Sequence, residues 1–368
     1  METVLTERLK TVEIYGLIHS ATRERLVSLA RLAARGKRRS PGVATFMLDI
    51  ERSVDELARC IGERTYRPGT GRAFTIQDPK PRRIFALPFR DRVAQHLLIA
   101  TTLPGIERSL APQTYACRSG YGTHRALRRA IDHTRARRWV LRLDIRRFFP
   151  SIDHAILRRL LDPTTPPRWR WLRDAFLDAP VEVERVAFHF PGDGLLTPLE
   201  RPHGLPIGSL TSQIWANVML SPLDHFLASG LSHGEFVRYC DDVLVFGDDP
   251  DRLRVVLASI EARVSSLRLK LHPGKTRLHR TSDPVPFVGF VLRRTSSGVS
   301  VRLRHDNVVR FRRRLADVQA MYSAGALPLS EVTSRIRAWL AHAKHGQTRA
   351  LCTAELARLR FSSGDGNG

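Results

Sequence analysis

The chain has 368 residues, 42% of them hydrophobic, so it can bury a sizeable core in two or three subdomains. Its 60 lysines and arginines exceed its 36 acidic residues by 24. This excess favours a polyanion as partner, above all nucleic acid, although a solvated basic surface from an arginine-biased genome is the alternative.

Secretion and membrane insertion are not indicated by the sequence. The four cysteines (60, 117, 240 and 352) lack disulfide or zinc spacing, and we expect them to be reduced. The N-terminus lacks the apolar stretch of a signal peptide, and no apolar run approaches the roughly 20 residues of a membrane span. We therefore expect a cytoplasmic protein without membrane contact.

Hydrophobic periodicity predicts an α+β chain whose last part is helical. Helical spacing occurs in six segments: residues 1–65, 91–110, 123–137, 209–227, 251–271 and 305–360. A further helix is expected from Ser151, and Ser221-Pro222 predicts a helix break. Strands are predicted within 73–89, 139–145, 236–247 and 286–304. The Pro-rich and Gly-rich segments 162–170 and 190–204 are predicted loops.

Three aspartates adjoin apolar strands. Asp144 ends the strand 139–145, and Asp241-Asp242 interrupt the apolar hairpin FVRYCDDVLVFG (236–247). Hard cations prefer oxygen ligands, so carboxylates at the ends of neighbouring strands can hold two Mg²⁺ ions. Two such ions support in-line phosphoryl displacement, the chemistry of nucleotide polymerisation. Taken alone, Asp144 also fits a strand-end or cap residue, and the pair fits a type I′ turn.

The motifs around these aspartates resemble those of reverse transcriptases, in the same order over roughly residues 30–345. The matching segments are KPRRIFALPFRDRVAQHLL (80–98), YACRSGYGTH (115–124), LDIRRFFPSID (143–153), GLPIGSLTSQ (204–213), RYCDD (238–242), LHPGKT (271–276) and PFVGF (286–290). The resemblance implies a right-hand polymerase fold with N-terminal helices and fingers (1–135), a palm (136–298) and a basic helical thumb with a short tail (299–368). It also implies a bacterial or phage-encoded RNA-directed DNA polymerase that acts on dNTPs, a template RNA and an RNA–cDNA duplex.

The resemblance implies roles for single residues as well. Asp144, Asp241 and Asp242, with the Ile145 carbonyl, are the implied ligands of two Mg²⁺ ions, for which Mn²⁺ can substitute. Lys275 is implied to protonate or neutralise the leaving pyrophosphate, although a phosphate contact or a solvated turn residue is the alternative. Further implied nucleotide-binding residues are Lys80, Arg82, Arg83, Arg147, Phe148, Phe149, Ile207 and Gln213. Implied primer and template contacts are Tyr239, Phe287, Gly289, Phe290, Arg302, Arg304, Arg310 and Arg313.

Phe149 occupies the position of a steric gate that would reject a ribose 2′-hydroxyl, whereas Phe148 better fits a core residue. In the basic segment 292–314, eight arginines stand against one aspartate, which fits a duplex-binding thumb or a solvated face.

The segment GLPIGSLTSQ departs from the pattern of most reverse transcriptases. Most carry a glutamine before the second glycine and end the motif in SP, where this chain has Ile207 and Gln213. The departure resembles the reverse transcriptases of diversity-generating retroelements. Loss of one discriminating hydrogen bond, about 1–3 kcal/mol, relaxes base selection roughly 10–200-fold. The resemblance thus implies adenine-directed mutagenesis of the cDNA and a small basic accessory protein that forms a pentamer.

Two other interpretations stay open. The first is another bacterial reverse transcriptase, of the group II intron, retron or phage-defence kind. The second is a catalytically inactive RNA-binding scaffold, against which the three aspartates, Arg82 and Lys275 argue.

Overall fold

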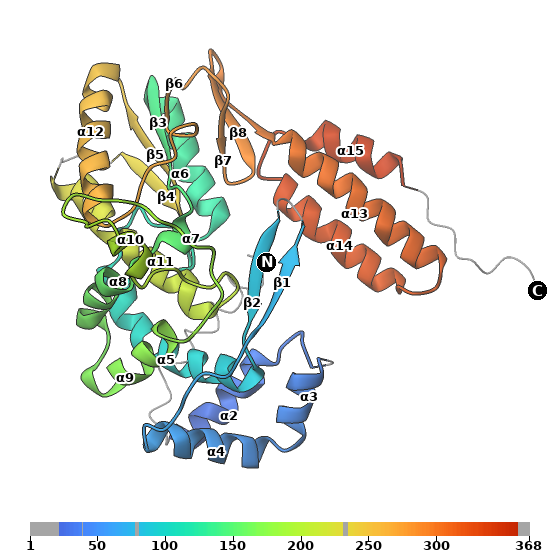
Figure 1. Cartoon of the computed structure of the whole chain (residues 1–368). Helices are drawn as coiled ribbons and strands as arrows, with labels where there is room; N and C mark the ends of the chain where they lie inside the picture. The colour runs from blue at the N-terminus through green and yellow to red at the C-terminus, as the bar shows by residue number, and fades with distance from the viewer. Residues whose placement is uncertain (1–21, 39, 78–80, 231–234, 360–368) are drawn as a thin grey trace, which may run out of the picture.

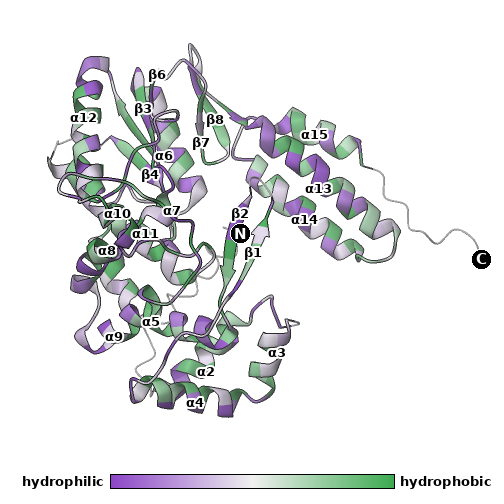
Figure 2. Cartoon of the chain, viewed as in Figure 1, coloured by the Kyte–Doolittle hydropathy of each residue, from purple (hydrophilic) through white to green (hydrophobic). Residues whose placement is uncertain are grey.

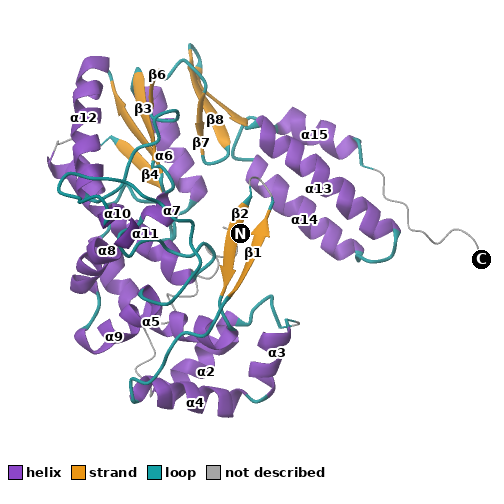
Figure 3. Cartoon of the chain, viewed as in Figure 1, coloured by secondary structure: helices purple, strands orange, loops and turns teal. Residues whose placement is uncertain are grey.

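The computed structural model describes residues 22–38, 40–77, 81–230 and 235–359. In the view of Figure 1, the N-terminal helices lie at the bottom, a four-stranded sheet at the upper left and the C-terminal helices at the right. Figure 3 shows that both the N-terminal region and the region of the four-stranded sheet contain helices and strands, so the predicted α+β class is confirmed. Within the described residues, no helix is both long and apolar enough to cross a membrane.

The N-terminal part is a helical cluster with a projecting hairpin. Helices α2 (Thr22–Ala33), α3 (Pro41–Leu48) and α4 (Ile50–Gly62) pack against α5 (Phe89–Ser109). Strands β1 (Arg72–Ile76) and β2 (Arg82–Ala86) form the predicted antiparallel hairpin between α4 and α5. Helix α5 is buried along most of its length and therefore forms the centre of this cluster.

The central sheet is antiparallel, in the order β4-β5-β3-β6. Its strands are β4 (Phe236–Tyr239), β5 (Asp242–Gly247), β3 (Trp139–Asp144) and β6 (Arg277–Arg280). Successive side chains point to opposite faces of a strand, so β3 buries Leu141 and Leu143 in one core and Val140 in another. The first core includes α8 (His154–Leu161), α11 (Leu210–His225) and α12 (Pro250–Ser266), and the second includes α6 (Thr123–Ala136).

Short elements connect these layers. They are α7 (Phe148–Ser151), two 3₁₀ turns (Asp162–Thr164 and Pro167–Trp169), α9 (Arg170–Leu177), α10 (Thr197–Glu200) and a π-helical turn (Phe226–Gly230). The predicted loop 162–170 therefore contains short helical turns.

The C-terminal part begins with the small sheet β7 (Val285–Phe287), β8 (Phe290–Thr295) and β9 (Gly298–Leu303). Helices α13 (His305–Ser323), α14 (Leu329–Ala343) and α15 (Arg349–Ala357) follow, as predicted. Hydrophilic and hydrophobic residues alternate along them in Figure 2. Phe311 and Trp339 stack with their ring centroids 3.7 Å apart, which joins α13 to α14. His124 of α6 stacks on His345 at 3.5 Å and thereby joins this part to the central sheet layer.

The structure differs from the predicted elements at one helix and at one strand. Pro222 does not break its helix, because α11 continues to His225. Most of this helix is buried, and packing against α5 and α8 compensates for the backbone hydrogen bond that a proline removes. Strand β6 was not predicted, because its residues RLHR are exposed or half-buried and show no hydrophobic alternation.

Candidate active site

The three predicted acidic residues meet at one edge of the central sheet. Asp144 is the last residue of β3 and pairs across the ladder with Asp242, the first residue of β5. Asp241 lies in the turn that joins β4 to β5, directly before Asp242. The sheet thus brings together residues that are almost a hundred positions apart in the sequence.

The turn before Asp242 has an unusual backbone. Tyr239 pairs with Asp242, so Cys240 and Asp241 are its two central residues. Cys240 has a φ of 54°, whereas Asp241 does not have a positive φ, so the alternative of a type I′ turn does not hold. A non-glycine residue in this region costs roughly 1–2 kcal/mol. The strained residue directly precedes Asp241 and fixes its position.

Burial disfavours negative charge on both aspartates of the hairpin. It raises the pKa of Asp241, and the nearby Asp144 carboxylate raises it further. Burial likewise raises the pKa of Asp242 to about 6, against the effect of Arg142, whose Nε donates to Asp242 Oδ1 over 3.2 Å. The edge therefore concentrates more negative charge than the protein itself compensates.

Lys275 lies at this edge, as predicted. Its Nζ is 2.9 Å and 3.1 Å from the two carboxylate oxygens of Asp144. The loop that carries it is held beside β3, because the backbone N–H of His272 donates to the Asp144 carbonyl over 2.8 Å. Ile145 is buried and faces Leu271 in an isolated bridge.

The donor set fits a hard divalent cation, since carboxylate oxygens dominate it and burial leaves their charge poorly solvated. Among the residues that the structure describes, no group of three or more acidic, histidine or cysteine side chains is placed so that it could hold a metal ion without rearrangement. Two of the three carboxylates are instead bound to cations of the chain, Asp144 to Lys275 and Asp242 to Arg142. A metal bound here would compete with these two side chains.

Of the predicted nucleotide-binding cations, Arg82 and Arg83 lie on β2 and Arg147 lies directly before α7. Arg82 begins β2 and lowers the pKa of Asp241, so this end of the hairpin lies within electrostatic range of the acidic edge. Arg83 is exposed and pairs with Glu182. Arg147 has a φ of 47° and pairs with Glu184 over 3.3 Å. Lys80 lies outside the described residues.

The two adjacent phenylalanines after Asp144 differ in exposure. Phe148 is 3% exposed and belongs to the core, whereas Phe149 is half-buried. The Leu205 N–H donates to the Phe149 carbonyl over 2.9 Å and ties the segment to GLPIGSLTSQ. Phe149 is therefore the accessible ring of the pair. The sequence likewise favours Phe149 for the gate and Phe148 for the core.

Ile207 and Gln213 lie on either side of the second glycine of this motif. The Ile207 carbonyl accepts from the Phe85 N–H over 3.0 Å, which attaches the motif to β2. Gln213 lines a cavity of about 330 Å³ together with Phe74, Ile84 and Gly208. Its Oε1 atom is buried and has no hydrogen-bond partner among the residues that the structure describes. Of the two residues, Gln213 therefore offers an unused polar atom to a cavity.

The predicted primer contacts need a correction at the β7–β8 turn. Phe287 and Phe290 are 1% and 0% exposed, so their rings belong to the core and cannot touch a nucleic acid. Val288 and Gly289 form the turn with φ values of 41° and 89°. The carbonyl of Gly289 accepts from the side chain of Asn307 over 2.9 Å, so the turn is fixed to α13.

The remaining predicted contacts are more accessible. Tyr239 is half-buried, and its hydroxyl lies 3.4 Å from Thr123 Oγ1. Arg302, Arg304 and Arg313 are exposed, and Arg310 is half-buried. Arg304 pairs with Asp306 over 2.7 Å, and Arg310 bonds to Asn307. These arginines lie along β9 and α13, away from the three carboxylates in sequence.

Arg142 is a site residue that the sequence analysis missed. It stands two residues before Asp144, so strand alternation places both side chains on one face of the sheet. An arginine within an otherwise apolar strand that ends in an acid was the available signal. Its contact with Asp242 identifies it as the cation beside the second carboxylate.

Comparison with known proteins agrees with this geometry. The family described as "Reverse transcriptase (RNA-dependent DNA polymerase)" matches residues 77–292. The chain belongs to the reverse transcriptase family. Its members are RNA-dependent DNA polymerases, and the matched residues include all three aspartates and Lys275. The family predicted from the motifs is thereby confirmed.

A relative in Myxococcus xanthus, the "Retron Mx65 reverse transcriptase", is 26% identical over 278 residues. The match covers 69% of this chain and 61% of the relative, so the chain spans less than two thirds of that protein's length.

Proposed function

We propose that this protein is an RNA-directed DNA polymerase that extends a primer on a template RNA by nucleotidyl transfer. The observation that carries the proposal is the meeting of Asp144, Asp241 and Asp242 at one edge of the sheet, with Lys275 and Arg82 beside them. Carboxylates for metal binding and cations for phosphate are the two charge types that this reaction needs. Membership of the reverse transcriptase family supports the same chemistry.

In the proposed reaction, the primer 3′ oxygen bonds to the α-phosphorus of a dNTP, and the bond from phosphorus to pyrophosphate breaks. Asp144, Asp241 and Asp242, with the Ile145 carbonyl, would hold two Mg²⁺ ions, which supply charge neutralisation at the attacking and leaving oxygens. Arg82 would bind the triphosphate, since its planar guanidinium can bond two phosphate oxygens at once. Lys275, once released from Asp144, would neutralise or protonate the pyrophosphate as the 3′-hydroxyl loses its proton.

The regions of a right-hand polymerase follow from this assignment. We infer that residues 1–135 include the fingers, 136–298 form the palm and 299–368 the thumb. Phe149 would act as the steric gate, because its ring is accessible and its carbonyl is fixed by Leu205. On this assignment, Phe149→Ala should incorporate ribonucleotides more readily than Phe148→Leu, which alters the core.

The kind of reverse transcriptase has two candidate answers. Ile207 and Gln213 favour an error-prone enzyme of a diversity-generating retroelement, which copies template RNA into adenine-mutagenised cDNA and works with a small basic accessory protein. Ile207 cannot donate or accept a hydrogen bond through its side chain, which supports relaxed base selection. The similarity to a retron reverse transcriptase favours the second answer, an enzyme that makes cDNA from a retron RNA.

Incorporation of dNTPs on a primed RNA, with and without Mg²⁺, tests the proposed polymerase. The Asp241→Ala Asp242→Ala variant should show none. If the wild-type protein extends no primer on any RNA, the scaffold interpretation replaces the enzyme.

Sequencing of the cDNA from a defined RNA separates the two candidate kinds. Errors concentrated at template adenines that fall in the Ile207→Gln variant would support the diversity-generating enzyme. A uniform, low error rate that Ile207→Gln leaves unchanged would remove that role from Ile207 and favour the retron kind.

A further inference from the structure

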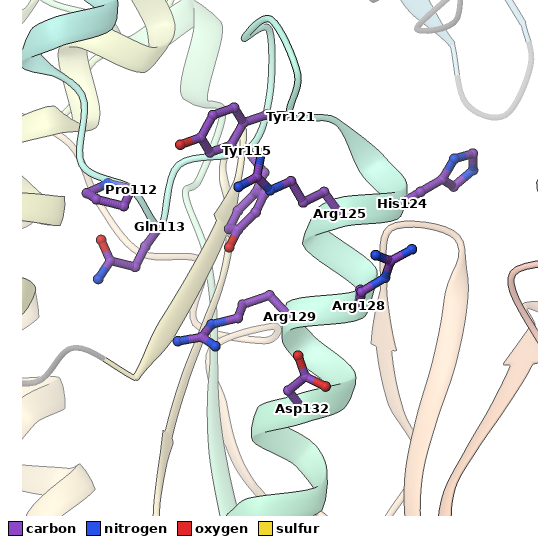
Figure 4. A pocket seen from close by; sticks show the side chains of 9 residues that line it. All are labelled: Pro112, Gln113, Tyr115, Tyr121, His124, Arg125, Arg128, Arg129 and Asp132. Atoms are coloured by element: carbon purple, nitrogen blue, oxygen red, sulfur yellow. The ribbon is translucent and has the colours of Figure 1, made fainter.

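A basic hollow of about 810 Å³ lies beside α6, between this helix and the loop that joins it to α5. Figure 4 shows its lining, which comes from α6 and from the loop before it. Tyr121 and Arg125 lie above Tyr115, and Arg129 extends toward the loop, whereas His124 and Arg128 extend to the other side of the helix. None of these residues belongs to the catalytic edge. The complete lining is Pro112, Gln113, Tyr115, Tyr121, His124, Arg125, Arg128, Arg129 and Asp132.

The aromatic part of the hollow is held rigidly. The Arg118 guanidinium lies 4.1 Å from the centroid of the Tyr121 ring, and the Arg125 guanidinium 4.4 Å from it. Arg118 is itself fixed, since it is buried, pairs with Glu107 over 2.9 Å and donates to the carbonyl of Ala111 over 2.8 Å. A preorganised stack of this kind loses little conformational entropy when a ligand binds.

The charges of the hollow are available to a ligand. Arg125, Arg128 and Arg129 are exposed, and none of them has a carboxylate partner within the described part of the chain. Asp132 is the only carboxylate among the described residues that line the hollow, and it lies 4.0 Å from Arg135. The hollow therefore keeps a positive charge beside aromatic rings.

The hollow also adjoins the catalytic hairpin through two contacts. The backbone N–H of Tyr115 donates to the carbonyl of Arg238 over 2.9 Å, and Arg238 stands three residues before Asp241. At the start of α6, Thr123 lies 3.4 Å from the hydroxyl of Tyr239. Arg129 is six residues along the helix from Thr123, about 9 Å at 1.5 Å per residue. A single strand that leaves the catalytic edge could reach the hollow within a few nucleotides.

We propose that this hollow binds a single-stranded segment of RNA away from the sheet edge where the three aspartates meet. Guanidinium groups suit phosphate oxygens, and a base can stack on an exposed guanidinium plane such as that of Arg125, which lies over the half-buried ring of Tyr121. The volume suits about one or two nucleotides and exceeds what a free phosphate needs. An acidic protein segment would use the charges but not the aromatic rings, so RNA is the better fit. The inference goes beyond the proposed polymerase and does not require it.

Fluorescence anisotropy with a short, unstructured, labelled single-stranded RNA tests the proposal. The full-length protein is used and no dNTPs are added. Arg125→Ala Arg129→Ala should weaken binding at least tenfold. It should also reduce the slope of log affinity against log salt by about 0.7 for each phosphate that the protein no longer neutralises. The matched control is Arg52→Ala Arg252→Ala, which removes the same charge from exposed positions on α4 and α12 and should change affinity less than twofold.

Two further variants separate stacking from charge. Tyr121→Leu keeps every charge but removes the ring on which the Arg125 guanidinium lies, and it should weaken binding about fivefold or more, because such a stack is worth about 1–3 kcal/mol. Arg129→Glu changes an exposed side chain without a described ion pair, so it tests the site even if the double variant folds poorly. Photocrosslinks from 4-thiouridine in the same RNA should map to residues 112–132.

Three outcomes would overturn the proposal. One is an equal decrease of affinity in the double variant and its control, which would indicate net charge alone. Another is unchanged binding by both Tyr121→Leu and Arg129→Glu. The last is displacement of the RNA by polyglutamate at matched charge, which would indicate an acidic protein partner. Primer extension on a short template is measured separately, so a failed polymerase proposal leaves the binding result interpretable.

Discussion

The β4–β5 hairpin carries two charged arrangements, three residues apart, that differ in how well their charges are compensated. Arg238 and Asp224 are both fully buried, with Arg238 Nη2 2.6 Å from Asp224 Oδ2. Arg238 also donates to the Asn217 side chain over 3.1 Å, the Cys240 carbonyl over 3.0 Å and Thr114 Oγ1 over 3.2 Å. Every charge in this arrangement has a partner, so it serves to fix the hairpin.

The Asp241-Asp242 pair is the opposite case. These carboxylates are partly exposed. Burial raises the pKa of both, as does repulsion by Asp144, and Asp242 is also repelled by Asp241. Their neighbouring cations, Arg142 and Lys275, belong to other strands or loops and compensate them incompletely. A fully paired buried charge thus holds structure, whereas an incompletely paired one at a sheet edge remains available for chemistry.

The largest effect is expected from the Asp241→Asn Asp242→Asn variant, which removes both charges of the incompletely compensated pair. We expect primer extension to fall about ten-thousandfold or more, about 5 kcal/mol of transition-state stabilisation. The thermal midpoint should stay equal or rise, because two poorly solvated charges are removed. Asp251→Asn, an exposed acid on α12, is the control and should keep full activity. A large decrease of stability in the double variant would contradict a catalytic role for the pair.

Asp224→Ala should have the opposite effect, because it should lower the stability of the fold rather than remove a group from the site. It leaves Arg238 buried without its counter-ion, which costs about 3–5 kcal/mol of unfolding free energy. Urea denaturation measures this cost. Replacement of both partners, in Asp224→Leu Arg238→Met, should recover much of the stability, because the unpaired charge is gone. A cost below about 1 kcal/mol for Asp224→Ala would show that the pair does not hold the hairpin.

Thr114→Val tests a weaker member of the same arrangement. The hydroxyl donates to Asp224 Oδ2 over 2.7 Å and accepts from Arg238. Its removal at nearly constant volume should cost about 1–3 kcal/mol in urea denaturation, with primer extension retained. Thr101→Val, whose hydroxyl bonds only within its own helix, is the control and should cost less.

The smallest expected effect is a pH dependence. The pKa of Asp242 is about 6 in the folded chain, above its ordinary value of 3.8, so the folded state binds this proton more tightly. Stability from this group is therefore lost as pH rises from about 4 to about 6. Without divalent ions, Asp242→Asn should gain about 1–2 kcal/mol over the wild type between about pH 4 and about pH 7. A constant difference across this range would contradict the raised pKa.

Local sequence signals predicted most of the fold. The hairpin 236–247, the strand before Asp144 and the helical tail all follow from apolar periodicity, which depends on neighbouring residues only. Strand β6 and the continuation of α11 through Pro222 depend on pairing and packing with distant segments. Those contacts have no signature in the local pattern, so the sequence could not reveal them.

The site residues were likewise predicted where a sequence motif marks them and missed where contacts with distant segments decide. Motif order placed Asp144, Asp241, Asp242 and Lys275 together, because their spacing reflects a known family. The burial of Phe287 and Phe290 was missed, since an aromatic residue beside a turn glycine fits a ligand contact as well as a core position. The ion pairs of Lys275 and Arg142 were also missed, because a pairing partner in another strand cannot be read from either strand alone.

The stack of His124 on His345 sets a limit on the conditions in which the C-terminal helices stay in place. Burial and the neighbouring His345 lower the pKa of His124 to about 4, and burial also lowers the pKa of His345. Near neutral pH the two rings are uncharged and can lie face to face. In stronger acid both would take up protons and repel each other across the joint between α6 and the helices beyond it. Acid would therefore weaken this contact between α6 and the C-terminal helices.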